Sequence, residues 1–295
     1  MNYSAVKNYF FLHGMVLVLG FTSILGRYIS LDATRMVWLR ILICCVCLNI
    51  CLGYKYGKQI TKLLRSKKLA LAGLFLALHW IFFYQTIKVS SVSVALVTFS
   101  TAPLFISFME PYFYKRKLWL YEIFIGLILI CAVILLFSFE SVNWTVVLIG
   151  LLSAFFSACF TVFNGLFREP LPALLIANVE LLYGLLTVSA VLFCMGKFDD
   201  QFLLITHGDI FYLLVLAIIC TIFPLWANIK LLKFFSPYTI ALTINLEMVY
   251  GIFLAVILFE EQNMLSARFF VGTFLIVLMV VVNMWAKVRR EGNIQ

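Results

Sequence analysis

A glutamate in the middle of a long apolar stretch is the residue whose chemistry is hardest to explain as packing. The stretch runs from Ser236 to Glu261 and carries Asn245 and Glu247 near its centre. A carboxyl group in the hydrocarbon region of a membrane is costly, so residues of this kind are usually functional. Glu247 is therefore a candidate to bind a substrate ammonium group or to carry a proton, with Asn245 as a polar neighbour. The alternative is a structural hydrogen bond to a neighbouring helix.

Two further residues would shape this site if the stretch is helical. Tyr250 and Gly251 follow Glu247 by three and four positions, so they share its helical face. Tyr250 offers an aromatic wall and a hydroxyl group, and we expect Gly251 to leave room beside the acid.

A second acid and an arginine also lie inside apolar runs. Glu180 is in the middle of the run 171–195, with Tyr183 on its face, and is a second candidate for substrate binding. For Arg40, in the second run, we expect a structural role. Its side chain either snorkels toward the membrane surface or pairs with Glu180, which would make Glu180 structural as well.

The run 69–88 supplies a possible aromatic wall. Trp80 and Tyr84 are four residues apart, so they lie side by side on one helical face. His79 precedes them and is able to titrate near neutral pH, and Asn228 in a later run adds an amide. Aromatic residues make up 17% of the chain, so the alternative is that this group only packs or contacts lipid.

Two of the prolines, Pro103 and Pro224, lie well inside apolar runs. Pro103 and Pro224 each remove one backbone hydrogen bond from a helix. They predict bent or broken helices of the kind that line transporter cavities, or, alternatively, static kinks.

Membrane-spanning helices must position all these residues. The 295 residues are 64% hydrophobic and 12% charged, with a mean hydropathy of +1.09, far more apolar than a soluble domain needs. Continuous apolar runs exclude a β-barrel, whose strands alternate. The net charge of +9 resides in short loops, which argues against nucleic acid as a partner. The ten runs are 9–27, 34–54, 69–88, 91–112, 119–138, 144–166, 171–195, 209–230, 236–259 and 264–286.

The runs form a weak internal repeat. An offset of 145 residues places Ser236 on Ser91 and Thr243 on Thr98. Because each half holds five helices, an odd number, the second half must enter the membrane from the opposite side. The fold class predicted is an all-α integral membrane protein with ten transmembrane helices in two inverted five-helix repeats. The predicted repeats are 1–139 and 140–295.

Basic residues orient the helices. With the amino terminus inside, the inner segments hold sixteen Lys and Arg residues and the outer segments five. This bias predicts a multi-pass protein of the cytoplasmic (plasma or inner) membrane with both termini in the cytoplasm.

The chain shows little sign of enzymatic chemistry. The eight cysteines lie in apolar runs without a metal-binding pattern, so no metal or cofactor is expected. A membrane-embedded transferase that acts on a lipid-linked substrate needs clustered acids or histidines. The only such cluster is Asp199, Asp200, His207 and Asp209, which a solvated loop explains at least as well.

Four sets of residues form recognisable motifs: Arg40, Ser93–Pro103 (SVALVTFSTAP), Asn245-Leu246-Glu247, and Phe259-Glu260-Glu261 followed by Gly272. These motifs resemble those of the drug/metabolite transporter superfamily, EamA type. The resemblance covers nearly the whole chain and departs from the family at Met248, where proline is usual, and at Lys115-Arg116-Lys117, where an acid is common. It implies export of amino acids or other small metabolites, with relatives that carry sugar nucleotides or phosphorylated sugars.

Together these observations predict a secondary active transporter that exports a small metabolite by alternating access, with possible proton coupling through Glu247. Its partners are a small-molecule substrate, the lipid bilayer and protons. The site is expected in a central cavity walled by the third, fourth, eighth and ninth runs and flanked by the seventh. The alternatives are the lipid-linked transferase and a sugar-nucleotide or sugar-phosphate carrier.

Overall fold

The computed structural model describes most of the two predicted repeats. The described residues are 3–115, 123–124, 126–128, 143–167, 171–199, 202–260, 271–272, 274, 277–278 and 282. The predicted runs 119–138 and 264–286 lie largely outside this part of the chain, as do Arg116, Lys117, Asp200 and Glu261.

Every regular element in the described part of the chain is a helix. The prediction of an all-α membrane protein is confirmed, and eight segments are long and apolar enough to span a membrane within the described residues. The elements are α1 (Tyr3–Tyr28), α2 (Ala33–Leu63), α3 (Lys67–Val89), α4 (Val92–Phe99), α5 (Ala102–Tyr114), α7 (Trp144–Gly165), α8 (Ala173–Cys194), α9 (His207–Ala217), the π-helical turn η1 (Ile218–Ile222), α10 (Phe223–Leu231), α11 (Pro237–Ile244) and α12 (Leu246–Phe259).

Short polar residues decide where many of these helices begin. In each case a side-chain oxygen accepts a hydrogen bond from a backbone N–H in the first turn, which would otherwise lack a partner. Ser91 caps α4 and Ser236 caps α11, two positions that the 145-residue offset makes equivalent. The other such caps are Asp32, Ser66, Asn143 and Thr206.

Two of the predicted helices are each broken near the middle. The fourth predicted helix divides into α4 and α5, and the ninth into α11 and α12. At the first break Pro103 has no N–H to donate to the preceding turn. The second break has no proline, and the N–H of Met248 donates instead to the carbonyl of Asn245, 3.1 Å away and only three residues back.

The two breaks lie against each other. Asn245 Nδ2 donates to the carbonyl oxygen of Ser100 over 2.8 Å, and these two residues are 145 positions apart. Equivalent residues of two repeats meet in this way where the axis relating them passes. The repeat offset seen in the sequence therefore corresponds to a contact at the centre of the bundle.

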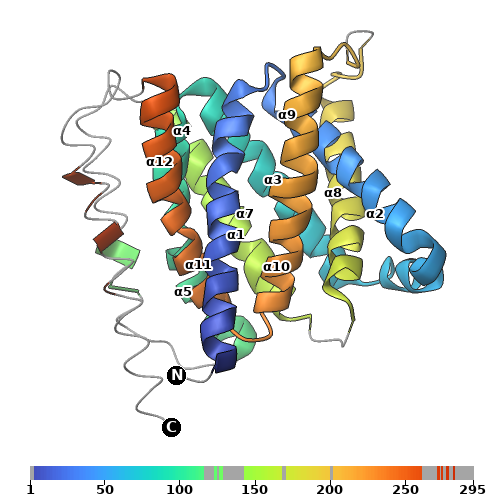
Figure 1. The fold of residues 1–295 in the computed structure, drawn as a ribbon, viewed down its shortest axis with the longest axis horizontal. Coiled ribbons are helices and arrows are strands. Elements are labelled where there is room, and N and C mark those ends of the chain that lie inside the picture. The colour runs from blue at the N-terminus through green and yellow to red at the C-terminus, as the bar shows by residue number, and fades with distance from the viewer. Residues whose placement is uncertain are drawn as a thin grey trace.

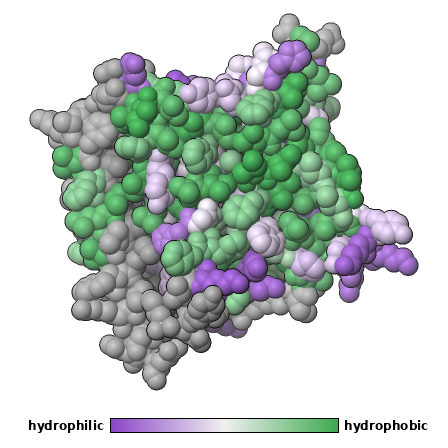
Figure 2. Space-filling view, in the orientation of Figure 1, coloured by the Kyte–Doolittle hydropathy of each residue, from purple (hydrophilic) through white to green (hydrophobic). Residues whose placement is uncertain are grey.

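The helices stand side by side with α1 between α12 and the α9–α10 pair (Figure 1). Behind α1, α3 of the first half packs extensively against α7 and α8 of the second half. Figure 2 shows that the visible face is mostly apolar, with hydrophilic residues gathered toward its edges. This distribution is that of a bundle whose outer surface contacts lipid.

Helix α2 is longer than its apolar run. The run ends at residue 54, but the helix continues to Leu63. Lys55, Lys58 and Lys62, expected in a connecting loop, are therefore on the last turns of a helix.

Candidate substrate-binding cavity

A cavity of about 100 Å³ lies between the two halves of the bundle. Both halves contribute side chains to it, from α1 to α4 on one side and from α7 and η1 to α12 on the other. The lining residues are Met15, Leu19, Thr22, Arg40, Leu76, His79, Trp80, Phe83, Tyr84, Phe99, Ser157, Phe160, Thr161, Cys220, Thr221, Pro224, Leu225, Asn228, Ile244 and Glu247.

Glu247 is the acidic side chain of this cavity. It is in the first turn of α12, just after the helix break, and is only 4% exposed. The Thr22 hydroxyl of α1 lies 3.3 Å from Glu247 Oε1 and 2.7 Å from the carbonyl of Leu19. One hydroxyl proton cannot serve both acceptors well. Glu247 thus has only a weak partner in α1, which leaves its carboxyl group available to a ligand or a proton.

Arg40 is the basic side chain of the cavity, and the protein holds it firmly. Its Nε donates to Thr221 Oγ1 (2.5 Å) and its NH1 donates to the Tyr84 hydroxyl (2.8 Å). The guanidinium lies over the Trp80 ring, 4.1 Å from the centroid. These contacts fix the orientation of the guanidinium and leave some of its five N–H groups for a ligand.

A proline creates one of the acceptors for this arginine. Pro224 follows Cys220 by four positions and cannot donate the helical hydrogen bond to its carbonyl. The helix widens here into the π-helical turn η1, where Thr221 Oγ1 donates to the carbonyl of Leu216. The carbonyl of Cys220 faces Arg40 NH2 at 3.5 Å. Turns of this kind are frequent at functional sites.

The structure overturns both expectations for Arg40. The side chain is 2% exposed, so it does not snorkel to the membrane surface. It also does not pair with Glu180, since its donors go to Thr221, Tyr84 and Cys220. Arg40 and Glu247 line one cavity, where their charges interact, but each uses other side chains as hydrogen-bond partners.

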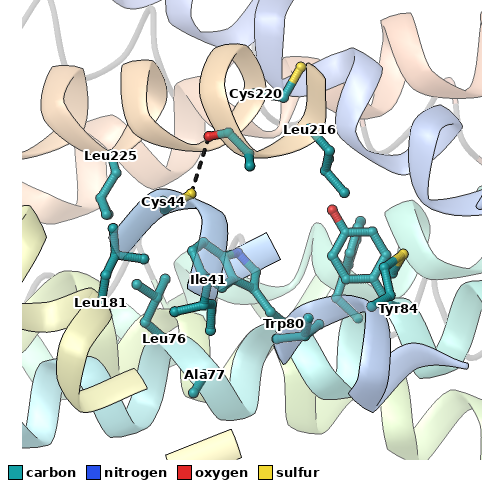
Figure 3. Close-up of a cluster of buried hydrophobic side chains, with 14 of the residues drawn as sticks. Ile41, Cys44, Leu76, Ala77, Trp80, Tyr84, Leu181, Leu216, Cys220 and Leu225 are labelled. Atoms are coloured by element: carbon teal, nitrogen blue, oxygen red, sulfur yellow. Dashed lines mark hydrogen bonds between the residues drawn. The ribbon is translucent and has the colours of Figure 1, made fainter. Parts of the chain in front are cut away.

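Aromatic rings form one wall of the cavity. Trp80 and Tyr84 project from successive turns of α3 toward the segment that carries Leu216 and Cys220 (Figure 3). His79, also on α3, has its Nδ1 2.9 Å from Ser153 Oγ of α7, and its ring stacks on Phe99. The imidazole therefore links the two halves through Ser153.

Sequence comparison decides the family. The sequence model of the EamA-like transporter family matches residues 6–139 and 144–285. The chain belongs to the EamA-like transporter family. It is thus an integral multi-pass membrane transporter, as the motifs predicted. Members of the family are transporters rather than enzymes.

One solved structure, described only as the crystal structure of a protein, has the same fold. It superposes with a TM-score of 0.66 at 16% identity, covering 94% of this chain and 96% of the other. No curated protein matches the chain at a significant level.

The cavity of this transporter includes five of the predicted site residues. They come from α3, α10 and α12, and α4 contributes Phe99, so residues from all four of the expected walls line the cavity. The seventh predicted helix, α8, contributes none of the lining residues, whereas α1, α2 and α7 do. The five residues are His79, Trp80, Tyr84, Asn228 and Glu247.

The other predicted residues lie elsewhere. Asn245 is buried at the helix break and bonded to Ser100, and Tyr250 is 39% exposed on α12. Gly251 does not leave room for a ligand, because a Cβ atom there would lie 2.4 Å from Leu96 Cδ1 of α4. Its small size lets α4 and α12 approach each other.

Glu180 is also outside the cavity. It is fully buried in α8, where Asn164 Nδ2 of α7 donates to its Oε2 over 3.3 Å. Its other oxygen has no hydrogen-bond partner in the described part of the chain.

Three threonines that line the cavity were not identified as candidate site residues from the sequence. Thr22, Thr161 and Thr221 come from α1, α7 and η1. Threonine in an apolar helix usually bonds its own backbone, so these residues carried no distinctive signal. For Thr221, its position three residues before Pro224 was the available clue.

One member of the cluster considered as an enzyme site, Asp209, has a structural role. Asp209 accepts hydrogen bonds from the N–H and hydroxyl of Ser30, at 2.7 and 2.6 Å, and from the Thr206 hydroxyl at 2.8 Å. It joins the start of α9 to the end of α1. Among the described residues, no three His, Cys, Asp or Glu side chains are grouped to hold a metal ion.

Proposed function

We propose that this transporter exports a small zwitterionic metabolite, such as an amino acid or a related organic compound, by alternating access coupled to protons. The observation that carries the proposal is the pair of opposite charges in one cavity. Arg40 and Glu247 both line it, and neither is the hydrogen-bond partner of the other.

A zwitterion complements this arrangement. The guanidinium of Arg40 is a planar donor suited to a carboxylate, and its orientation is set by Trp80, Tyr84 and Thr221. Glu247 would receive the ammonium group of the same molecule. The cavity volume of about 100 Å³ suits a small compound.

The same geometry disfavours the alternative substrates. A sugar phosphate or sugar nucleotide brings two or more negative charges, for which the cavity offers Arg40 but also the repulsive Glu247. Apart from Arg40, the lining side chains from the described part of the chain include no lysine or second arginine.

Proton coupling follows from the chemistry of Glu247. A carboxylate that binds an ammonium group can instead bind a proton, and the two exclude each other. Proton binding from one side would therefore release the substrate there, and proton loss on the other side would prepare the site for the next molecule. His79, Asn228 and the aromatic wall would position the rest of the substrate, and Asn245 and Tyr250 would support α12.

The orientation belongs to the same proposal. We place the protein in the cytoplasmic membrane with both termini in the cytoplasm, and we divide the chain into repeats 1–139 and 140–295. A reporter fused after Gln295 should behave as cytoplasmic and one inserted near Asp199 as external. The opposite labelling would refute the topology.

A transport assay tests the substrate class. Purified protein in liposomes would be offered a panel of amino acids, their decarboxylated amines, their deaminated acids and sugar phosphates, with and without a pH gradient. We expect gradient-driven transport of one or more amino acids and little transport of the singly charged analogues. Equal transport of a matching amine or acid, or preferred transport of a sugar phosphate, would contradict the zwitterion proposal.

A further inference from the structure

The junction of α2 and α3 carries an unusual concentration of positive charge, here called the basic elbow. All six of its basic side chains are exposed, and none forms an ion pair within the described residues. The chain has no Asp or Glu between Asp32 and Glu110. Apolar residues of the same segment, Ile60 and Leu63, are buried. The elbow consists of Lys55, Lys58, Lys62, Arg65, Lys67 and Lys68.

The length of α2 places this charge at the membrane surface. The helix has 31 residues, which at 1.5 Å per residue is about 46 Å, against about 30 Å of hydrocarbon. Its apolar part ends at Tyr54, which is fully exposed, and the Lys55 ammonium lies over the Tyr56 ring, 5.2 Å from the centroid. Tyrosines of this kind mark the boundary between hydrocarbon and headgroups.

The direction of α2 keeps the elbow close to lipid. Figure 1 shows its last turns leaning away from α8, toward the lower right. Figure 2 shows a hydrophilic projection at the same edge, beside the apolar face. A helix that left the membrane upright would carry its charges into water, whereas this one extends sideways over the surrounding bilayer.

The fold itself does not require the elbow. The equivalent helix of the other half, α8, has 22 residues and ends at Cys194. It is followed by a segment of mixed charge, with Lys197 and Asp199. Nine additional helical residues and their charges are thus a feature of one half only.

We infer that the basic elbow binds anionic phospholipid headgroups of the leaflet that it faces. The six charges are spread along a helix and around a turn, where each can approach a different phosphate. They do not converge on an enclosed pocket, which a single free phosphate would need. Clusters of four to eight basic residues next to a membrane helix have this affinity in general.

The test compares two pairs of lysines in the purified full-length protein. Native mass spectrometry in neutral detergent would measure binding of phosphatidylglycerol and of phosphatidylcholine with the same acyl chains. The variant Lys58→Gln/Lys62→Gln alters the elbow, and Lys230→Gln/Lys233→Gln makes the same change in net charge near the end of α10. At about fivefold per residue, we expect the elbow pair to weaken phosphatidylglycerol binding by about 25-fold. The α10 pair should change it by less than about twofold.

Further measurements separate the possible outcomes. The charge-preserving variant Lys58→Arg/Lys62→Arg should bind phosphatidylglycerol like the wild type, which keeps the test valid if the glutamine pair folds poorly. Inorganic phosphate should not compete at millimolar concentration. Equal weakening by both glutamine pairs, equal binding of the two lipids, or full competition by phosphate would overturn the inference.

Discussion

Two buried glutamates of the second half, Glu247 and Glu180, lie in different surroundings. Glu247 lines a cavity that also holds Arg40, and its nearest partner is the shared hydroxyl of Thr22. Glu180 is 0% exposed between packed helices, with Asn164 as its partner, and it is not among the residues that line this cavity. Both are intramembrane acids, yet only one can meet a ligand without rearrangement of the helices around it.

The difference shows that an acid inside a membrane is not enough to define a site. The sequence made both residues candidates, because each interrupts an apolar run. The two glutamates differ in what the neighbouring helical segment presents. The π-helical turn η1 presents Thr221 and the carbonyl of Cys220 to Arg40, which places a positive charge across the cavity from Glu247. Nothing comparable faces Glu180 in the described part of the chain.

The largest effect on transport is expected from replacing Arg40, the cation of the cavity that Glu247 lines and Glu180 does not. Arg40→Gln removes the proposed carboxylate ligand and leaves Thr221 and Tyr84 without their donor. A charged hydrogen bond contributes about 1.5–3 kcal/mol, so transport should fall by about 10- to 150-fold. Initial rates in proteoliposomes measure this, with Arg40→Lys as a control that keeps the charge and should retain more activity. Unchanged transport in Arg40→Gln would remove Arg40 from the site.

A smaller effect on transport is expected from replacing Trp80, whose ring lies against the guanidinium of this arginine. Trp80→Leu removes the ring under the guanidinium while keeping an apolar side chain. A buried cation–π contact is worth about 2 kcal/mol, so the apparent affinity for substrate should fall by about 30-fold at most. The maximal rate should change less than the affinity. Phe82 is on the same helix and outside the cavity residues, so Phe82→Leu serves as the control.

Replacement of Glu180 should leave transport almost unchanged. Glu180→Gln keeps an oxygen for Asn164 and removes a carboxyl group that has an unpartnered oxygen. We expect transport within about twofold of wild type and a thermal midpoint that is unchanged or higher, because the cost of burying the acid is removed. Loss of activity in a normally folded Glu180→Gln protein would show that the site extends beyond the cavity.

The smallest effect is expected at Tyr250. Its side chain is 39% exposed, and it is absent from the cavity although it follows Glu247 by three residues. Tyr250→Phe should therefore transport at the wild-type rate within experimental error. A reduced affinity would indicate that the hydroxyl reaches the substrate in another conformation.

Much of the architecture could be predicted because it depends on patterns along the chain. Apolar runs predicted the membrane-spanning helices, and the same 145-residue offset separates Ser100 and Asn245, which are in contact. Pro103 indicated one helix break, but the matching break at Asn245 has no proline and was expected as continuous helix.

The site was harder to predict, because it depends on which helical faces meet. Arg40 was expected to snorkel or to pair with Glu180, because its spacing does not reveal that Pro224 leaves the carbonyl of Cys220 without its helical donor and facing Arg40. Gly251 was placed beside the acid by helical periodicity, but the space next to it is filled by Leu96 of a distant segment. Spacing within one helix carries no information about such neighbours.

The most direct test of this account is pH-gradient-driven transport by Glu247→Gln and Glu180→Gln, measured side by side in proteoliposomes. Both substitutions remove one intramembrane carboxyl group at nearly constant shape, so each is the control for the other. The account predicts that Glu247→Gln abolishes the response to the pH gradient, whereas Glu180→Gln responds like the wild type. A gradient response that survives in Glu247→Gln and disappears in Glu180→Gln would contradict it.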